Sequence, residues 1–435
     1  MAGNAEIRAG RLSKAEIDDN FADLHPPLTR SEALIEADRC YFCYDAPCTT
    51  ACPTGIDIPA FIQKIRSDNL RGSARTILSE NIMGGMCARV CPTEVLCEEA
   101  CVRNTHEEKP VEIGLLQRYA TDPVFEHSDQ LFQRAAATGK KVAVVGGGPA
   151  GLSCAHRLAV LGHNVTIFNR DSKLGGLNEY GIAAYKAIDD FAQTEVDYIL
   201  SIGGIEVRNN LMLGVNFGLD DLRQEYDAVF LGVGLALSNN LGVEGEELDG
   251  VVNAIEYIAK LRQAADKSTL PVGRKIVVIG GGMTAIDVAV QSKRLGAEEV
   301  HMVYRRGPEQ MSASVFEQAL AQTSGVTLHH WASPARILGD DFVTGVEFDV
   351  DRSDGGVRLD ADVVFKAIGQ RMDGNGLASL ASESGRFIVD EHQKTSSDKV
   401  WAGGDCVVGG NDLTVSAVQH GKIAAISIDR TLRSR

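Results

Sequence analysis

Eight of the ten cysteines in this 435-residue sequence lie within its first 101 residues, in two groups of four. The first group is Cys40, Cys43, Cys48 and Cys52, and the second is Cys87, Cys91, Cys97 and Cys101. The first group has the spacing C-x2-C-x4-C-x3-C-P, close to the bacterial ferredoxin pattern, in which the last cysteine binds the other of two clusters. The pattern therefore predicts a pair of [4Fe–4S] clusters at one end of the chain.

Two structural zinc sites are the alternative, because each group of four cysteines could bind one zinc ion. The prolines directly after Cys52 and Cys91 and the ferredoxin-like spacing favour iron–sulfur binding. If the ferredoxin crossover holds, one cluster takes three ligands from the first group and a fourth from the second group. Cys52 then belongs to the other cluster.

The composition restricts the partners and the compartment. A net charge of −16 argues against a nucleic-acid partner. Residues 1–10 lack the apolar segment of a signal peptide, and no apolar run approaches the roughly 18 residues of a membrane-spanning helix. We therefore expect a cytoplasmic protein that binds neither nucleic acid nor membranes. In that reducing compartment, grouped cysteines are metal ligands more often than disulfides.

Three zones differ in sequence pattern. Residues 1 to about 120 carry the cysteines between helical patterns such as Ile58–Ile65 and show no strand alternation, which predicts an all-α domain. A polar stretch from about residue 121 to 139 follows as a linker. From Lys140 onward, strand and helix patterns alternate, which predicts an α/β fold.

Two segments of the α/β zone share one pattern, in which a buried strand leads through a glycine turn into a helix. The first strand, Lys141–Val145, is followed by Gly146, Gly148 and Gly151. The second strand, Lys275–Ile279, is followed by Gly280, Gly282 and Ala285. In such turns the first glycine permits the tight turn, the second lets a pyrophosphate approach the backbone, and the third small residue lets helix and strand pack closely. We therefore expect two Rossmann-like dinucleotide-binding units.

The residue that ends the next strand of each unit bears on the ribose of the cofactor. In the first unit this residue is Asn169, where an acid is usual, although an amide can still bind a hydroxyl. In the second unit the strand ends in Arg305 and Arg306, which could accommodate an adenosine 2′-phosphate and favour NADPH over NADH. A solvated basic pair is the alternative.

A late segment, Val400–Cys406, ends a strand in a Gly-Asp turn, and a helical pattern begins at Thr414. Behind a dinucleotide fold this arrangement suits a flavin. Asp405 could bind the ribityl–phosphate region, and the helix N-terminus could direct its partial positive charge at the ring. An ordinary turn and surface helix are the alternative. Neither Cys154 nor Cys406 belongs to a C-x-x-C pair, so we expect no redox disulfide of the thioredoxin reductase type.

The cysteine segments resemble a known family. Residues 40–48 (CYFCYDAPC), 51–58 (ACPTGIDI), 87–94 (CARVCPTE) and 113–117 (IGLLQ) resemble dihydropyrimidine dehydrogenase. Over nearly its whole length, the chain is similar to the small, flavin-bearing subunit of the bacterial enzyme. It resembles the small subunit of bacterial glutamate synthase more loosely.

This resemblance implies a ligand set for each cluster. One cluster would be bound by Cys40, Cys43, Cys48 and Cys101. The other would be bound by Cys52, Cys91, Cys97 and Gln117. The glutamine is an unusual ligand, and Cys87 is the alternative to it, because thiolate is the commoner ligand of such clusters.

The resemblance also implies the order of the domains. FAD would bind the first dinucleotide unit, near a second glycine pair that ends at Gly176, and NAD(P)H would bind the second unit, which is inserted into the first. We therefore expect an iron–sulfur domain at 1–135, an FAD-binding domain at 136–250 and 363–435, and an NAD(P)-binding domain at 251–362. Residues 181–186 depart from the Pro/Arg/Leu-rich segment of the family, so the local flavin contacts stay open.

The function implied by the resemblance is that of an electron-input subunit. It would take hydride from NAD(P)H onto FAD and pass single electrons through two [4Fe–4S] clusters, without a protein general acid. The electrons would reach a separate catalytic subunit with FMN and iron–sulfur clusters that reduces uracil or thymine, so a hetero-oligomer is expected. The alternatives are the small subunit of glutamate synthase and a flavin-less iron–sulfur scaffold or sensor, for which Asn169 is the only hint.

Overall fold

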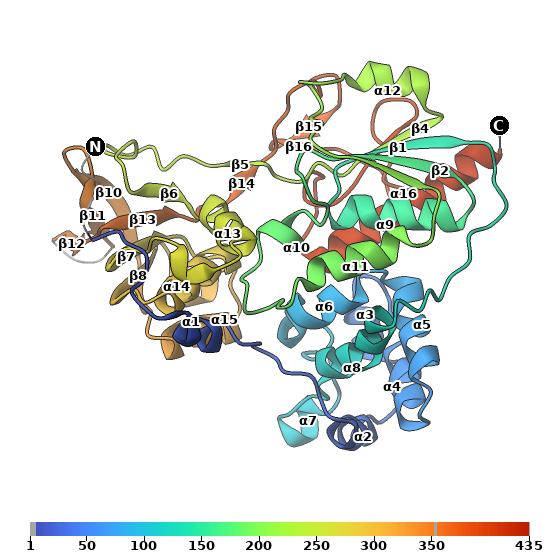
Figure 1. The fold of residues 1–435 in the computed structure, drawn as a ribbon, viewed down its shortest axis with the longest axis horizontal. Coiled ribbons are helices and arrows are strands. Elements are labelled where there is room, and N and C mark those ends of the chain that lie inside the picture. Colours follow the sequence, from blue (N-terminus) through green and yellow to red (C-terminus); the bar gives the residue numbers. More distant parts are fainter. Residues whose placement is uncertain (1–5, 352–354, 435) are drawn as a thin grey trace. The chain divides into compact units, whose positions relative to one another are not determined.

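The computed structural model describes residues 6–351 and 355–434, and the chain divides into two compact units. The larger unit comprises residues 25–179, 189–236 and 372–435. The smaller unit comprises residues 1–24, 180–188 and 237–371. Figure 1 labels the elements of both units. The chain therefore passes between the units several times.

The N-terminal part of the larger unit is helical. Its elements are α2 (Arg30–Asp38), α3 (Pro47–Ala51), α4 (Ile58–Arg66), α5 (Leu70–Glu80), α6 (Gly84–Val90), a 3-10 turn (Thr93–Val95), α7 (Asn104–Glu107) and α8 (Ile113–Glu126). Short polar side chains set three of the helix starts: Thr29 caps α2, Asp57 caps α4 and Asn69 caps α5. No strand occurs between residues 25 and 135, all of which the structure describes, so the predicted helical character is confirmed.

The larger unit also contains a five-stranded parallel sheet. Its strands lie in the order β17 (Val400–Ala402), β4 (Ala228–Leu231), β1 (Lys141–Val145), β2 (Asn164–Phe168) and β3 (Ile205–Arg208). In Figure 1, three helices lie together below this sheet, namely α9 (Pro149–Val160), α11 (Phe191–Leu200) and α16 (Thr414–Arg433). Around it lie α10 (Leu177–Tyr180), α12 (Leu219–Glu225) and a hairpin of β15 (Ser382–Glu383) and β16 (Arg386–Phe387).

The smaller unit is built on a second five-stranded parallel sheet. Its strands lie in the order β6 (Val251–Asn253), β13 (Val363–Lys366), β7 (Lys275–Ile279), β8 (Glu299–Tyr304) and β9 (Thr327–His330). Its helices are α1 (Lys14–Asn20), α13 (Ala254–Gln263), α14 (Met283–Arg294) and α15 (Val315–Thr323), with 3-10 turns at Lys267–Thr269 and Pro308–Gln310. Antiparallel pairs join β10 (Ala332–Gly339), β11 (Val343–Val350) and β12 (Val357–Asp360), and β5 (Leu237–Ser238) with β14 (Gln370–Arg371).

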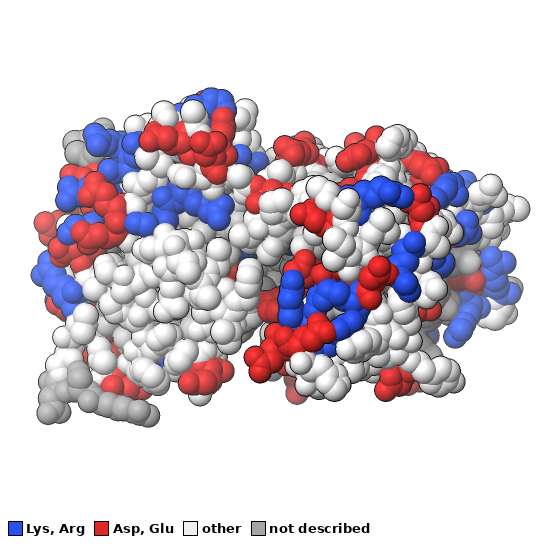
Figure 2. All heavy atoms as spheres, turned by 90° about the horizontal axis from the view of Figure 1, so that it is seen from below, with Lys and Arg blue, Asp and Glu red and all other residues white. Residues whose placement is uncertain are grey.

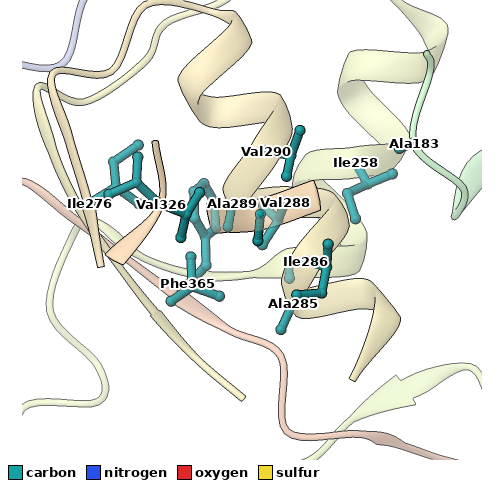
Figure 3. Close-up of a cluster of buried hydrophobic side chains, with 14 of the residues drawn as sticks. Ala183, Ile258, Ile276, Ala285, Ile286, Val288, Ala289, Val290, Val326 and Phe365 are labelled. Carbon is teal, nitrogen blue, oxygen red and sulfur yellow. The ribbon is translucent and has the colours of Figure 1, made fainter. Parts of the chain in front are cut away.

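The core of the smaller unit forms around α14, as Figure 3 shows. Ile286 and Val290 of this helix belong to one buried cluster with Ile258 of α13 and Phe365 of β13. Ala183, from a distant part of the sequence, belongs to the same cluster. The two parallel sheets confirm the α/β fold expected from the alternating pattern after Lys140.

The structure corrects the predicted domain boundaries. Residues 363–366 do not resume the first sheet, because β13 pairs with β7 in the second one, and Asp362 accepts hydrogen bonds from the backbone N–H groups of Lys275 and its neighbour. Residues 237–250 also belong to the smaller unit, as do 1–24 and 180–188. Ile17 lies in the core of the smaller unit, and the backbone N–H of Ala183 donates to Asp287 of α14 at 3.1 Å.

Candidate cluster and cofactor sites

Four cysteines from both groups line one pocket in the larger unit: Cys40, Cys43, Cys48 and Cys101. The remaining wall is largely apolar and includes Ile58, Pro59 and Ile62 at the start of α4. Among the residues that the structure describes, no three His, Cys, Asp or Glu side chains converge as the ligands of a single metal ion do. The four cysteines instead line one pocket, as the ligands of a cluster of several atoms do.

Burial disfavours the thiolate form of two cysteines in this pocket, Cys40 and Cys48. It raises the pKa of Cys40, and it raises the pKa of Cys48 to about 11. In both cases the neighbouring thiol of Cys101 raises the pKa further, so Cys101 lies within electrostatic range of both. A thiolate here needs a nearby positive charge, and metal binding supplies one.

A second set of cysteines lies along α6 and the adjoining loops. Burial raises the pKa of Cys91 well above its usual value, and the neighbouring Cys87, Cys97 and Cys52 raise it further. Burial also raises the pKa of Cys97 well above its usual value, and Cys52 again adds to the shift. These thiols therefore lie close enough to interact with one another, as ligands of a second cluster must.

Gln117 and Cys87 both belong to this neighbourhood. Gln117 is a buried residue of α8, and its Nε2 donates to the backbone oxygen of Gly84 at 2.6 Å. Since the nitrogen is engaged, the side-chain oxygen is the end of the amide that could bind iron. The Cys87 thiol is fully buried, and burial raises its pKa above the usual value. Both residues are thus candidates for the fourth ligand of the second cluster.

The first glycine turn has the shape that a pyrophosphate needs. A Cβ at Gly146 would lie 2.2 Å from the oxygen of Gly232, and one at Gly151 would lie 1.9 Å from the oxygen of Gly146. Both positions therefore require glycine for close packing. A Cβ at Gly148 would meet only the Cα of Gly176, at 3.8 Å. The space in front of Gly148 is the one that a phosphate could fill at the start of α9.

Asn169 differs from its predicted role. Its Oδ1 accepts the backbone N–H of Gly147 at 3.2 Å, and its Nδ2 donates to the backbone oxygens of Asp171 and Lys173 at 2.8 and 2.9 Å. The amide is buried, and its hydrogen bonds connect the glycine turn to the following loop. An amide can do this because it both donates and accepts, so the predicted contact with a ribose hydroxyl is not supported.

The late Gly-Asp turn meets the starts of α9 and α16. A Cβ at Gly404 would lie 3.0 Å from the Cβ of Ala150 in α9 and 3.7 Å from that of Ala417 in α16. Burial, together with the nearby Asp412, raises the pKa of the adjacent Asp405 to about 6. Asp405 and Thr414 therefore share one edge of the sheet with the first glycine turn, where open α/β sheets bind ligands.

Two further residues of this edge, Asn178 and His420, were not predicted from the sequence. The Thr414 hydroxyl donates to Oδ1 of the buried Asn178 at 2.7 Å. Asn178 lies two positions after the second glycine pair. The Nδ1 of His420 accepts the backbone N–H of Gly404 at 3.1 Å. A polar residue near a glycine pair only weakly indicates a binding site, so Asn178 was hard to identify from the sequence. No sequence motif distinguishes His420.

The second glycine turn is equally tight. A Cβ at Gly280 would lie 2.2 Å from the oxygen of Ala367, while Gly282 has only the Ser312 hydroxyl nearby, at 3.1 Å. Ala285 is fully buried at the start of α14. The first glycine of this turn therefore packs against backbone, as in the first turn, whereas a Cβ at Gly282 would be tight only against the Ser312 side chain.

Arg305 and Arg306 are exposed after the end of β8. Within the part of the chain that the structure describes, neither guanidinium forms an ion pair. The backbone oxygen of Arg306 accepts the N–H of Trp331, which follows β9. Both cations are thus available to an anionic group at this edge of the second sheet.

Charged side chains of both signs are interspersed on the face drawn in Figure 2. Beside them lies a broad area of uncharged side chains. In the described part of the chain, no helix combines the length and apolarity needed to span a bilayer.

Two protein families match the chain. Residues 17–129 match the family described as dihydropyrimidine dehydrogenase domain II, 4Fe-4S cluster, and residues 140–421 match the pyridine nucleotide-disulphide oxidoreductase family. The first match contains all eight grouped cysteines, and the second contains both glycine turns.

Curated relatives match over nearly the whole chain. The NAD-dependent dihydropyrimidine dehydrogenase subunit PreT of Salmonella typhimurium is 35% identical over 415 residues, covering 95% of this chain and 98% of the relative. The glutamate synthase [NADPH] small chain of Escherichia coli is 34% identical over 442 residues, covering 94% and 93%. Among solved structures, thioredoxin reductase of T. acidophilum covers 68% of this chain and 99% of its own, with a TM-score of 0.55 and 21% identity, which indicates a shared fold.

Proposed function

Because the chain belongs to the family of PreT-like small subunits of NAD-dependent dihydropyrimidine dehydrogenase, we propose that it is the electron-input subunit of such an enzyme. One observation carries the proposal. A single compact unit contains both a cavity lined by cysteines of the two groups and a glycine turn with room for a phosphate. Such a unit can hold a flavin and iron–sulfur clusters together.

Each cofactor has a set of residues that would hold it. Cys40, Cys43, Cys48 and Cys101 would hold one [4Fe–4S] cluster. Cys52, Cys91, Cys97 and Gln117 would hold the other, because the Nε2 of Gln117 donates to Gly84 and its oxygen is the end of the amide that could bind iron. When bound, FAD accepts a hydride from a nicotinamide cofactor, and the clusters carry single electrons.

The remaining residues bind and orient. The turn at Gly146–Gly151 and the N-terminus of α9 would bind the pyrophosphate of FAD, and Asp405 would lie at its ribityl–phosphate part. Thr414 is the first residue of α16. The partial positive charge at the N-terminus of this helix would favour negative charge on the flavin. In the smaller unit, Gly280, Gly282 and Ala285 would bind NAD(P)H, and Arg305 with Arg306 would favour NADPH through its 2′-phosphate.

The pyrimidine would be reduced on another subunit. The described sheets of this chain are two open parallel sheets and small antiparallel pairs, and neither kind forms an FMN-binding barrel. The partner would therefore carry FMN, its own iron–sulfur clusters and the site for uracil or thymine, in a hetero-oligomer. The names of the PreT relatives, which describe subunits, support this view.

A second candidate is the small subunit of an NADPH-dependent glutamate synthase, since that relative is 34% identical over nearly the same length. The two enzymes differ in the partner and not in the electron-input chemistry.

Anaerobic purification of the chain tests the proposal directly. We expect bound flavin, iron, and reduction of ferricyanide by NADPH or NADH. Capture of partners from the native cell extract, followed by assays with uracil and with glutamine plus 2-oxoglutarate, then chooses between the two enzymes. A chain without flavin, or without NAD(P)H-dependent ferricyanide reduction, would refute the electron-input function.

A further inference from the structure

Lys422 is a buried charge to which the proposed cofactor sites assign no role. It lies on α16 and is 8% exposed. Its Nζ donates to the backbone oxygen of Thr54 at 2.8 Å and to Oε2 of Glu80 at 2.9 Å. Burying an ammonium group is costly unless it is paired and hydrogen-bonded, so these two contacts define its position.

The first contact connects Lys422 to the neighbourhood of a proposed cluster ligand, Cys52. Thr54 is 2% exposed and follows Cys52 by two positions, and its Oγ1 lies 3.3 Å from the sulfur of Cys52. The backbone N–H of Gly55 donates to the oxygen of Cys52 at 2.9 Å, which closes the turn. Lys422 therefore binds the turn that presents Cys52.

The second contact leads to the end of α5. Glu80 is the last residue of this helix, and its side chain is 45% exposed. From α9, Arg157 donates to the backbone oxygen of the preceding residue, Ser79, at 2.5 Å. The two helices that begin at the proposed flavin site thus each contribute one cationic side chain that contacts the cysteine-bearing part of the unit.

These two helices form one packed pair. A Cβ at Gly421 would lie 2.1 Å from the backbone oxygen of Ala150, so the glycine allows α16 to lie directly against α9. The hydroxyl of Ser153 on α9 donates to the oxygen of Val418 on α16 at 2.8 Å. Lys422 follows the crossing point by one residue and lies about 12 Å along α16 from Thr414, at 1.5 Å per residue.

We propose that Lys422 is a positioning residue for electron transfer between the flavin and the cluster at Cys52. It holds the Cys52 turn against the flavin-site helix and supplies a positive charge beside the cluster, which Glu80 partly balances. This inference rests on the proposed function, because it requires FAD at the starts of α9 and α16 and a cluster at Cys52. A nearby positive charge favours the reduced cluster, since reduction adds an electron.

Two substitutions with opposite expected effects test this role. Lys422→Met removes the positive charge and leaves the Glu80 carboxylate, so the midpoint potential of one cluster should fall. Glu80→Gln leaves the ammonium without its counter-charge, so the same potential should rise. We expect a change of about tenfold in the ratio of reduced to oxidised cluster in each direction, which is about 59 mV for a one-electron couple.

The measurement is a redox titration of the anaerobically purified holoprotein, followed by electron paramagnetic resonance. Lys422→Arg should keep the wild-type potential, and Arg433→Met, at the far end of α16, should leave both clusters unchanged. Iron, flavin and the rate of flavin reduction by NADPH are measured on the same samples. If Lys422→Met fails to fold, Glu80→Gln and Lys422→Arg carry the test.

Unchanged potentials in Glu80→Gln, or shifts of the same sign in Glu80→Gln and Lys422→Met, would overturn the role of Lys422. In that case full iron and flavin content with normal flavin reduction would leave the proposed function standing. A wild-type chain without iron or flavin would overturn the proposed function, and with it this inference.

Discussion

Replacing Gly421 with alanine tests whether the proposed flavin site depends on the close crossing of α9 and α16. A Cβ at this position would lie 2.1 Å from the backbone oxygen of Ala150 and 2.9 Å from the backbone nitrogen of Cys154. Carbon and oxygen atoms in close contact are about 3.3 Å apart. The two helices must therefore separate by about 1 Å, which displaces the first glycine turn relative to Thr414.

The energetic cost follows from two opposing effects. Overpacking costs roughly 1–3 kcal/mol, and we expect the upper part of this range, about 2–3 kcal/mol, because the two nearest atoms belong to the backbone. Alanine is better than glycine inside a helix by about 1 kcal/mol. We expect a net loss of about 1–2 kcal/mol in the free energy of unfolding. Each kcal/mol should lower the melting temperature by roughly 2–4 °C. Flavin affinity should fall at least about tenfold, or 1.4 kcal/mol, because the residues from the two helices no longer lie in register.

Gly114→Ala is the matched control. Gly114 also lies inside a helix, α8, but a Cβ there would meet its nearest atom at 3.4 Å, an ordinary contact. This variant should be as stable as the wild type or slightly more stable. Flavin-to-protein ratios and thermal unfolding of the three proteins provide the assay. A Gly421→Ala protein with the wild-type melting temperature and full flavin content would refute the reasoning.

Two other predictions concern a buried histidine and the nucleotide site. Burial lowers the pKa of His156 to about 3, so its neutral form stabilises the fold above pH 6.5, and that stability is lost as the pH falls toward 3. Between pH 7 and pH 5 the loss should be about 2 kcal/mol in urea unfolding, and His156→Leu should remove it; an unchanged pH dependence in the variant would contradict this. The double substitution Arg305→Ala with Arg306→Ala should raise the KM for NADPH at least about tenfold and the KM for NADH little. Steady-state ferricyanide reduction measures both constants, and equal effects on the two cofactors would exclude binding of the 2′-phosphate.

Most features that could be predicted from the sequence depend on local patterns. The spacing of the cysteines and the two glycine turns depend on residues close together in the chain, and the structure contains the expected helical segment, two strand–turn–helix units and two parallel sheets. The ferredoxin pattern predicted that one cysteine of the second group joins three of the first, and only the family resemblance identified it as Cys101, which lines the same pocket.

Long-range contacts explain what the sequence could not predict. The assignment of residues 180–188 to the smaller unit depends on hydrogen bonds from Ala183 and Ala184 to side chains of α14, more than a hundred positions away. The strand at 363–366 reads as an ordinary apolar run, and only its pairing with β7 identifies its sheet. The bracing role of Asn169 depends on the exact course of the loop that follows it.

The central claim is that the two cysteine groups form one interleaved pair of clusters. Iron content after anaerobic purification tests it most directly, because two [4Fe–4S] clusters hold about eight iron atoms per chain. Cys101→Ala should retain about half of this iron, since the first cluster loses a ligand. Cys87→Ala should retain nearly all of it, since Gln117 and not Cys87 is the proposed fourth ligand of the second cluster. Full retention of iron in Cys101→Ala would contradict the interleaved arrangement, and loss of half of the iron in Cys87→Ala would contradict Gln117 as the fourth ligand.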